Sequence, residues 1–298
     1  MQGIRKLGTL VEHVAEDTPF EYHDELLLLE SIRVLTPGNT HNGEHYLRII
    51  RLTDGTRDVE SPEEYAACEI LTEFAVGYTF GVPFIGGDTI YVYATIAEYA
   101  DLATKPEVDD IHVFWSDDLK NWKEKTVIRG DSEQLFNTSI CRTDDRFVMA
   151  YETNDRTWKP FTIRFAESDD LLNWRNIPAE KALYGPDRYA ACPTIRWMDG
   201  MFYLICLELP GGPEKWWFEE HAARSTDLLH WTKSPANPVL APEPDGSEMI
   251  NTSDIDFCEF DGKTIIYYVW GSQRGEEFLA HAVFDGTERE FLLATFGE

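Results

Sequence analysis

The sequence predicts an all-β protein in which a single domain, residues 1–298, forms a five-bladed β-propeller with four antiparallel strands per blade. Two repeated features support this prediction. The phrase Ser-x-Asp-Leu-x-x-Trp occurs three times, and its tryptophans Trp122, Trp174 and Trp231 are 52 and 57 residues apart. An acidic or glycine turn also precedes a strongly apolar stretch five times. Periods of this size are typical of radially repeated sheets.

The five turns divide the chain into units of about 60 residues, the size expected of one blade. They are His23-Asp24, Gly87-Asp88, Asp144-Asp145, Asp199-Gly200 and Asp261-Gly262. Within a unit we expect an innermost strand before the turn, the apolar strand after it, a strand that ends at the Ser-x-Asp-Leu phrase, and a short outer strand. In the phrase, Ser and Asp bond to the turn backbone and Trp covers the hairpin.

Three further segments complete the prediction. The first dozen residues alternate in polarity (LGTLVEH), and we expect them to close the ring by pairing with the last unit. The last unit carries a degenerate phrase at residues 282–287, with Phe291 near the tryptophan position. Residues 61–74 give the best helix signal, because Ser61 and Pro62 suit a helix start.

The charge of the chain limits its partners. Lys and Arg number 26 against 54 Asp and Glu, which gives a formal charge of −28. Such an acidic surface repels phosphate backbones and anionic lipids, so we expect neither a nucleic-acid nor a membrane partner. The N-terminal segment lacks the apolar core of a signal peptide, and a cytoplasmic location is therefore the default expectation.

Metal and cofactor motifs are absent from the sequence. The five cysteines form no C-x-x-C pair, and no P-loop, G-x-G-x-x-G, H-E-x-x-H or G-x-S-x-G motif occurs. His41 and His45 fall in a predicted loop, where their spacing does not suit a metal. We expect no cofactor, apart from a structural cation that the axial channel can accommodate. Any chemistry must come from residues dispersed along the chain.

The repeated Ser-x-Asp-Leu-x-x-Trp phrase resembles the blade signature of the five-bladed propeller glycosidases, namely glycoside hydrolase families 43, 32, 68, 117 and 130. The resemblance covers nearly the whole chain but does not select one family. It implies an axial pocket for an oligosaccharide, with a blade-one Asp as base or nucleophile, a supporting Asp, and a Glu as general acid. Independently, glycosidic cleavage needs two carboxyl groups about 5 to 10 Å apart.

Counting back seven residues from the acidic residue of each turn gives the expected starts of the innermost strands. These positions are Asp17, Gly81, Thr138, Cys192 and Asp254. Asp17 matches the blade-one Asp of the families and is our candidate base. Elsewhere the sequence departs from the pattern. It has Ala191 before Cys192-Pro193, where invertase-type relatives have Glu, and Asn137-Thr138 in blade three, where relatives place an Asp.

Other carboxyl groups are candidates for the missing acid. Residues after the apolar strands return to the same end of the propeller, which makes candidates of Glu30, Glu152, Asp155 and Glu208. Glu208 and Glu152 are the leading candidates of these four. Asp254 and Asp256 stand at positions i and i+2 and are expected on one face of a strand. Such a pair can divide acid and base roles or hold a cation. Each of these acids can equally be an ordinary loop or turn carboxylate.

Several residues are candidates for sugar binding. Trp216 and Trp217 lie in the loop after Glu208, and aromatic faces stack on sugars. One of these two tryptophans is expected to be structural. The remaining candidates are Asn137, from blade three, and three arginines that suit hydroxyl or carboxylate groups: Arg156, Arg188 and Arg274.

These observations predict a glycoside hydrolase that cleaves a small neutral or mildly acidic oligosaccharide by carboxylate acid–base catalysis. The alternative is a non-catalytic carbohydrate-binding propeller derived from such an enzyme, as Ala191 and Asn137 would allow. A third possibility is a protein-interaction propeller, which predicts an exposed apolar face instead of a polar axial pocket.

Overall fold

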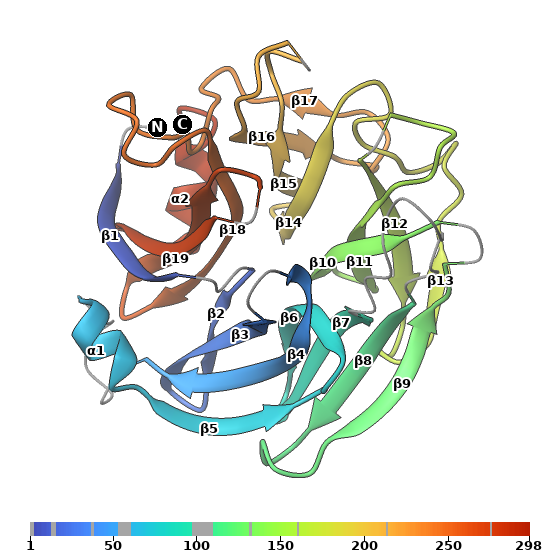
Figure 1. Ribbon diagram of the computed structural model, residues 1–298. Coiled ribbons are helices and arrows are strands. Elements are labelled where there is room, and N and C mark those ends of the chain that lie inside the picture. The colour runs from blue at the N-terminus through green and yellow to red at the C-terminus, as the bar shows by residue number, and fades with distance from the viewer. Residues whose placement is uncertain are drawn as a thin grey trace.

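The computed structural model describes residues 3–12, 16–36, 39–52, 61–96, 110–130, 133–159, 161–212, 214–274 and 276–298. In this part of the chain, the strands form five antiparallel sheets of four strands each, arranged as blades around a central axis (Figure 1). The predicted fold class is confirmed. Neither helix in the described residues has the length and apolar character needed to cross a membrane.

Successive segments of the chain form the blades. Blade one contains β2 (Thr18–Tyr22), β3 (Glu25–Thr36), β4 (Asn39–Arg51) and β5 (Glu69–Phe74). Blade two contains β6 (Tyr78–Gly86), β7 (Thr89–Ile96), β8 (Ile111–Ser116) and β9 (Lys123–Ile128). Blade three contains β10 (Leu135–Arg142), β11 (Phe147–Thr153), β12 (Thr162–Ser168) and β13 (Trp174–Asn176). Blade four contains β14 (Ala190–Met198), β15 (Met201–Glu208), β16 (Glu219–Ser225) and β17 (Thr232–Lys233).

Blade five joins the two ends of the chain. It contains β18 (Asn251–Phe260), β19 (Lys263–Gly271) and β20 (Glu277–Phe284), and its outer strand is β1 (Ile4–Glu12). The antiparallel pairing of β1 with β20 confirms the predicted closure of the ring. Lys6 of β1 donates to Ala241 O at 2.9 Å and also bonds to Glu248. These contacts attach β1 to the segment that precedes β18.

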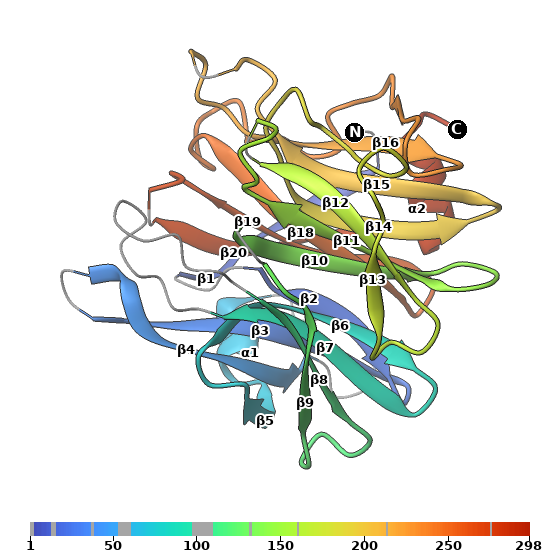
Figure 2. The same cartoon turned by 90° about the vertical axis from the view of Figure 1, so that its right-hand side faces the viewer.

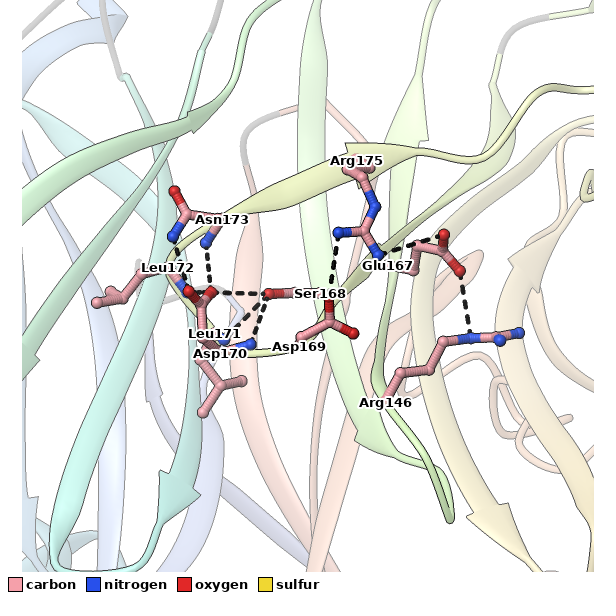
Figure 3. Close-up of polar contacts among 9 residues, drawn as sticks. All are labelled: Arg146, Glu167, Ser168, Asp169, Asp170, Leu171, Leu172, Asn173 and Arg175. Carbon is pink, nitrogen blue, oxygen red and sulfur yellow. Dashed lines mark hydrogen bonds and ion pairs between the residues drawn. The ribbon is translucent and has the colours of Figure 1, made fainter.

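The Ser-x-Asp-Leu-x-x-Trp phrases form the hairpins that connect the third and fourth strands. In blade three, Asp170 Oδ1 accepts the backbone N–H groups of Leu172 and Asn173 at 3.0 and 2.8 Å (Figure 3). Ser168 Oγ accepts the N–H of Leu171 at 3.0 Å. Leu171 has a φ of 67°, a left-handed conformation that is costly for leucine, and burial of its side chain offsets that cost.

The hairpin tryptophans connect neighbouring blades. Trp122 of blade two stacks on Phe74 of blade one, with ring centroids 3.8 Å apart. Trp174 of blade three meets the edge of Tyr93, and Trp231 of blade four stacks on Phe165. Each tryptophan therefore packs on the preceding blade, which explains why the phrase recurs with the blade period.

The core consists of apolar layers between adjacent blades. Figure 2 shows the strands of the blades from the side. Because both faces of every blade are covered, apolar residues run continuously along the second strands. Leu26 and Leu28 face blade five, whereas Leu27 and Leu29 face blade two, and all four are fully buried. Complete burial of one leucine side chain contributes about 1.5 to 3 kcal/mol.

The helix predicted over residues 61–74 is much shorter in the structure. Helix α1 covers Pro62–Ala66, with Ser61 as its N-cap, and residues 69–74 form β5 instead. Ile70 and Thr72 are β-branched and pair with β4, while Phe74 is covered by Trp122, so tertiary contacts favour a strand. Helix α2 (Glu288–Ala294) follows blade five, and its Phe291 is buried against Phe257.

Candidate functional site

Backbone irregularities position the side chains at the centre of the ring. The innermost strands β6, β10, β14 and β18 each contain a β-bulge. One residue with left-handed φ stands at each of these bulges, and another stands two residues before β2. These five residues are Glu16, Phe80, Asn137, Cys192 and Asp254. All five line one cavity, so the bulges direct these residues toward the propeller axis.

The space between the residues of this axial cavity, including the part open to solvent, has a volume of about 330 Å³. All five innermost strands, or the residues directly before them, contribute to its wall. The structure thereby brings together four of the predicted site residues: Asp17, Asn137, Asp254 and Asp256.

Counting seven residues back from each turn aspartate does not give structurally equivalent residues in all five blades, because the count is off by one residue between some of them. In blades one and two the acidic residue is second in the turn, as in His23-Asp24, whereas in blades four and five it is first, as in Asp199-Gly200. A count from the aspartate therefore shifts by one between the two pairs of blades. Cys192 and Asp254 are equivalent to Glu16, and Asp17 is equivalent to Pro193.

Asp17 is held rigidly at the cavity wall. It directly precedes β2 and is 2% exposed. Its Oδ1 accepts the backbone N–H of Ser31 at 3.1 Å, and the hydroxyl of Ser31 in turn accepts the N–H of Gly81 at 3.1 Å. This chain of bonds connects Asp17 to the bulge of blade two, so the carboxyl group has one defined orientation.

Glu152, at the end of β11, lies behind the same wall and is 4% exposed. Its Oε2 accepts the backbone N–H of Cys192 at 2.9 Å and the side-chain amide of Asn137 at 3.0 Å. Within the described residues, Oε1 has no hydrogen-bond partner and is not a buried atom. Burial raises the pKa of Glu152 to about 7, the two hydrogen bonds oppose this shift, and the charge of Asp254 adds to it.

Asp254 and Asp256 both line the cavity, but strand alternation is not the reason. The bulge between Ser253 and Asp256 interrupts β18, and Asp254 has a φ of 57°. Asp256 Oδ1 accepts a hydrogen bond from Arg196 Nη2 at 2.9 Å. Arg196 and Asp256 also line a second cavity of about 840 Å³ farther along the axis. Asp256 is thus part of an ion pair, whereas Asp254 influences its neighbours through its charge.

Glu208 lies apart from the residues that line the axial cavity. Its Oε1 accepts from the hydroxyl of Tyr184 at 2.7 Å, and its Oε2 forms an ion pair with Lys233 Nζ at 2.5 Å. Tyr184 and Cys206 belong to the apolar layer between blades three and four. These contacts use both carboxyl oxygens of Glu208 to hold neighbouring side chains together. Of the two predicted acids, Glu152 is therefore the one better positioned for catalysis at the axial cavity.

Sequence reasoning did not single out Glu220, a further buried carboxyl group near the cavity. Glu220, on β16, is 0% exposed, and its Oε1 accepts the N–H of Ile255 at 3.3 Å in the bulge of blade five. Burial, together with the charge of Asp254, raises its pKa well above the usual range. Glu220 lies on the third strand of its blade, whereas the sequence pattern predicts site residues only at the starts of the innermost strands and at the ends of the second strands.

The two adjacent tryptophans have different environments. Trp216 is 45% exposed, and its ring meets the edge of Phe218 with a centroid distance of 4.9 Å. Phe218 in turn contacts Tyr189, which packs beside Cys192. Trp217 is partly buried and donates to Glu219 at 2.9 Å. Trp216 is therefore available for a ligand, and Trp217 fixes the loop.

The three predicted arginines do not line the axial cavity. Arg188 forms an ion pair with Asp187 at 3.3 Å and lies over the ring of Tyr184. Arg156 and Arg274 are exposed in loops. An acidic sugar was expected because these arginines could form a local group. The described wall of the cavity contains none of the three. In the described residues, no group of three or more His, Cys, Asp or Glu side chains is arranged to hold a metal ion.

Comparison with known proteins shows that this chain is similar in fold to several solved structures. No protein-family profile and no curated protein matches the sequence. Among solved structures, a glycoside hydrolase is similar with a TM-score of 0.71 at 14% identity, covering 94% of this chain and 91% of that one. An α-L-arabinofuranosidase from Lactobacillus brevis has a TM-score of 0.67 at 12% identity, with coverages of 93% and 94%.

A third similar structure is an N-acetylgalactosamine deacetylase from F. plautii in complex with blood group B trisaccharide. Its TM-score is 0.66 at 12% identity, and the alignment covers 96% of this chain and 92% of that chain. At these identities the comparisons show the fold. They confirm that the chain shares the five-bladed architecture of the propeller glycosidases that its repeated phrases resemble.

Proposed function

We propose that the protein is a glycoside hydrolase that cleaves a small oligosaccharide at the axial cavity. The observation that carries this proposal is the combination of Asp17 in the cavity wall with Glu152 behind it, two buried carboxyl groups with different environments. Glycosidases require such a pair, one group to protonate the leaving oxygen and one to activate water or attack carbon. The similarity in fold to a glycoside hydrolase and an arabinofuranosidase supports the same class.

Glu152 has the properties of the general acid. With a pKa of about 7 it is about half protonated at pH 7, and a donor with such a pKa is effective at that pH. Asn137 and the N–H of Cys192 hold Oε2, which leaves Oε1 to carry the proton toward a glycosidic oxygen. Asp254 assists by its charge, which favours the protonated form of Glu152.

Asp17 has the properties of the base. The N–H of Ser31 stabilises a negative charge on its carboxyl group, and its place before β2 directs it to the cavity. The bound sugar would lie between Asp17 and Glu152, and Trp216 would stack on a second sugar outside the cavity. The substrate is then an oligosaccharide, as is the trisaccharide bound by the F. plautii enzyme.

A carbohydrate-binding propeller without catalysis is the second candidate. One observation favours it: Glu152 and Glu220 both accept N–H groups at bulges, which are structural contacts that a binding protein would also need. Asn137 lines the cavity and Ala191 precedes Cys192, and these are the two positions where a hydrolase of the related families would have carboxyl groups.

The two functions are separated by one panel of assays. The native protein is incubated with nitrophenyl glycosides and with plant or algal oligosaccharides, and Asp17→Asn serves as the inactive control. Hydrolysis that falls at least about 100-fold in Asp17→Asn, with unchanged circular dichroism, supports the hydrolase. Binding without turnover, or turnover unaffected by Asp17→Asn, contradicts it.

A further inference from the structure

The end of the propeller that carries the axial cavity also carries a continuous chain of aromatic contacts. It begins at Phe80 in the cavity wall and ends at the exposed Trp216, and neighbouring ring centroids lie 4.9 to 6.1 Å apart. In order from the cavity, the rings are those of Phe80, Phe136, Phe161, Tyr189, Phe218 and Trp216. Each ring lies near the start of a first or third strand, and in an antiparallel blade these starts share one end. The aromatic chain therefore runs along this end from blade two to blade four.

Backbone hydrogen bonds hold the aromatic chain in place. The carbonyl of Phe161 accepts the N–H of Ala190 at 2.9 Å, which joins the loop of blade three to the start of β14. The N–H of Phe218 donates to Ile250 O at 2.9 Å and thereby joins the loop of blade four to blade five. The rings are thus fixed before any ligand arrives, and a preorganised surface loses little conformational entropy on binding.

The rings differ in their access to solvent. Phe161 and Tyr189 are partly exposed, Trp216 is 45% exposed, and the other three rings are buried. The accessible rings therefore begin beside the cavity and continue outward to Trp216, with the buried Phe218 as the link between Tyr189 and Trp216.

Tyr189 also offers a polar group to a ligand. Its hydroxyl is accessible to solvent and forms no hydrogen bond within the described residues. Burial of the ring, followed by the charges of Glu152 and Asp254, raises the pKa of Tyr189 well above its usual range, so the hydroxyl keeps its proton. A sugar ring has an apolar face and a rim of hydroxyl groups, and an aromatic ring with a free hydroxyl donor matches both.

The surroundings of Trp216 favour a sugar over an apolar partner. Among the described residues, the other exposed large apolar side chains are Ile70 and Val76, which lie on β5 and in the loop after it. Trp216 is thus not part of a broad exposed apolar patch of the kind that marks a protein or lipid interface. A single exposed ring suits stacking on one sugar unit.

We propose that the aromatic chain is a binding surface for an oligosaccharide that extends from the axial cavity across blades three and four, with one sugar unit at Tyr189 and the next at Trp216. The substrate class is thus oligosaccharides of three or more units, and the sugar at Trp216 is the third unit. This inference rests on the proposed function, because the first unit occupies the cavity in which the glycosidic bond would be cleaved.

The test measures affinity against chain length. Linear oligosaccharides of glucose, xylose, galactose and arabinose, each from one to five units, are titrated by calorimetry into Asp17→Asn, which lacks the proposed base. Stacking on one ring corresponds to about two- to tenfold in affinity. The trisaccharide of at least one series should therefore bind about tenfold or more tightly than its monosaccharide. The gain should end by the fourth unit, because Trp216 is the outermost ring of the chain within the described residues.

Variants made in the same Asp17→Asn background assign the gain to individual rings. Trp216→Ala should remove the gain from the third unit and leave the affinity for the monosaccharide within about twofold. Tyr189→Phe, which keeps the ring and removes the hydroxyl, should weaken binding of the disaccharide, but not of the monosaccharide, by about two- to tenfold. Trp115→Ala is the control, because Trp115 is also partly exposed but lies toward the opposite end of blade two. It should leave all affinities within about twofold.

The outcomes separate this inference from the proposed function. The inference is overturned if no series gains affinity from one to three units, even if the native protein hydrolyses nitrophenyl glycosides. It is also overturned if Trp216→Ala leaves the gain intact or if Tyr189→Phe leaves disaccharide binding unchanged. A gain that depends on both residues supports the inference, and if the native protein then cleaves none of the bound oligosaccharides, it is the hydrolase proposal that fails.

Discussion

The backbone N–H of Cys192 donates a 2.9 Å hydrogen bond to Glu152 Oε2, which connects blade four to blade three at the edge of the axial cavity. One carboxyl group thus satisfies a bulge amide through Oε2, whereas its Oε1 has no hydrogen-bond partner among the described residues. Glu152 combines a structural contact with a perturbed acidity, and experiments on this residue must separate the two roles.

Replacing Glu152 with Gln should remove the proton donor while retaining an acceptor for the Cys192 N–H. For oligosaccharides, whose leaving group needs a proton, we expect kcat to fall at least about 100-fold. For nitrophenyl glycosides, whose leaving group needs little protonation, the loss should stay below about tenfold. Steady-state kinetics on both substrates is the measurement, and equal losses on the two would contradict an acid role.

Glu208→Gln is the matched control for this variant. Glu208 is also buried and ends the second strand of the next blade, but it pairs with Lys233 away from the axial cavity. We expect kcat to remain within about threefold, because no step uses this group. Stability should fall by about 1 to 3 kcal/mol, since Lys233 and Tyr184 lose a charged partner.

The dependence of activity on pH should identify Glu152 and its coupling to Asp254. Because the acid must be protonated, kcat should decline as pH rises through about 7, the pKa of Glu152. In Asp254→Asn the negative charge that raises this pKa is gone, so the decline should begin at lower pH. Profiles of kcat against pH for both proteins provide the comparison. A decline that stays at the same pH in the variant would show that Asp254 has no such influence.

Stability should respond to the same ionisation. The pKa of Glu152 in the folded protein, about 7, lies above the usual glutamate value of 4.5, so the folded protein retains a proton that the unfolded chain releases between these values. The stabilising contribution is complete below about pH 4.5 and is lost as pH rises toward 7. Each unit of pKa difference corresponds to about 1.4 kcal/mol.

Urea unfolding of the native protein and Glu152→Gln over this range isolates the contribution, because other buried acids such as Glu220 occur in both proteins. The difference in unfolding free energy, native minus variant, should decrease from pH 4.5 to 7 and level off above it. A difference that increases with pH would be inconsistent with a raised pKa.

Trp216→Ala should weaken substrate binding without affecting the fold. Trp216 is 45% exposed, so its removal deletes little of the core, whereas loss of a stacking surface should raise KM about five- to tenfold. Val76→Ala is the control, because Val76 is also exposed and lies in another loop. Steady-state kinetics and thermal unfolding test both statements, and an unchanged KM would exclude Trp216 from the binding site.

Lys6→Met should weaken the closure of the ring. Lys6 neutralises Glu248, which is mostly buried and also accepts a hydrogen bond from Tyr268, and it contacts Glu243 at 3.0 Å. We expect a loss of about 1 to 3 kcal/mol in unfolding free energy. Arg5→Met, on the exposed side of the same strand, should change it by less than about 0.5 kcal/mol. Deletion of residues 1–10 should be more harmful than either substitution, because it exposes the edge of β20.

The fold was predictable from the sequence because each blade repeats the same local chemistry. Ser168, Asp170 and Trp174 make contacts within one hairpin or with the adjacent blade, so the residues that determine the architecture recur at regular spacing. The shortened helix was not predictable, since residues 69–74 adopt a strand through contacts with β4 and Trp122, which the local sequence does not specify.

The site was predictable only in part. Asp17, Asn137 and Asp254 lie at positions fixed by the blade period, and the structure brings them to one cavity. The environments of Glu152 and Glu208 could not be distinguished, because they depend on side chains of other blades or strands. Cys192 and Asn137 hold Glu152 beside the cavity, whereas Tyr184 and Lys233 direct Glu208 away from it.

The pairing of β1 with β20 also affects the order in which the protein can assemble. A ribosome delivers β1 first and β20 near the end of synthesis, so β1 has no partner while blades one to four emerge. Each of those blades is continuous in sequence and can form during translation, but blade five cannot be completed until its third strand is made. The two ends of the described chain meet at blade five, where Ile4 packs against the cluster that contains Phe291 and Phe296. Joining them and opening the chain between two blades would let all five form in the order of synthesis.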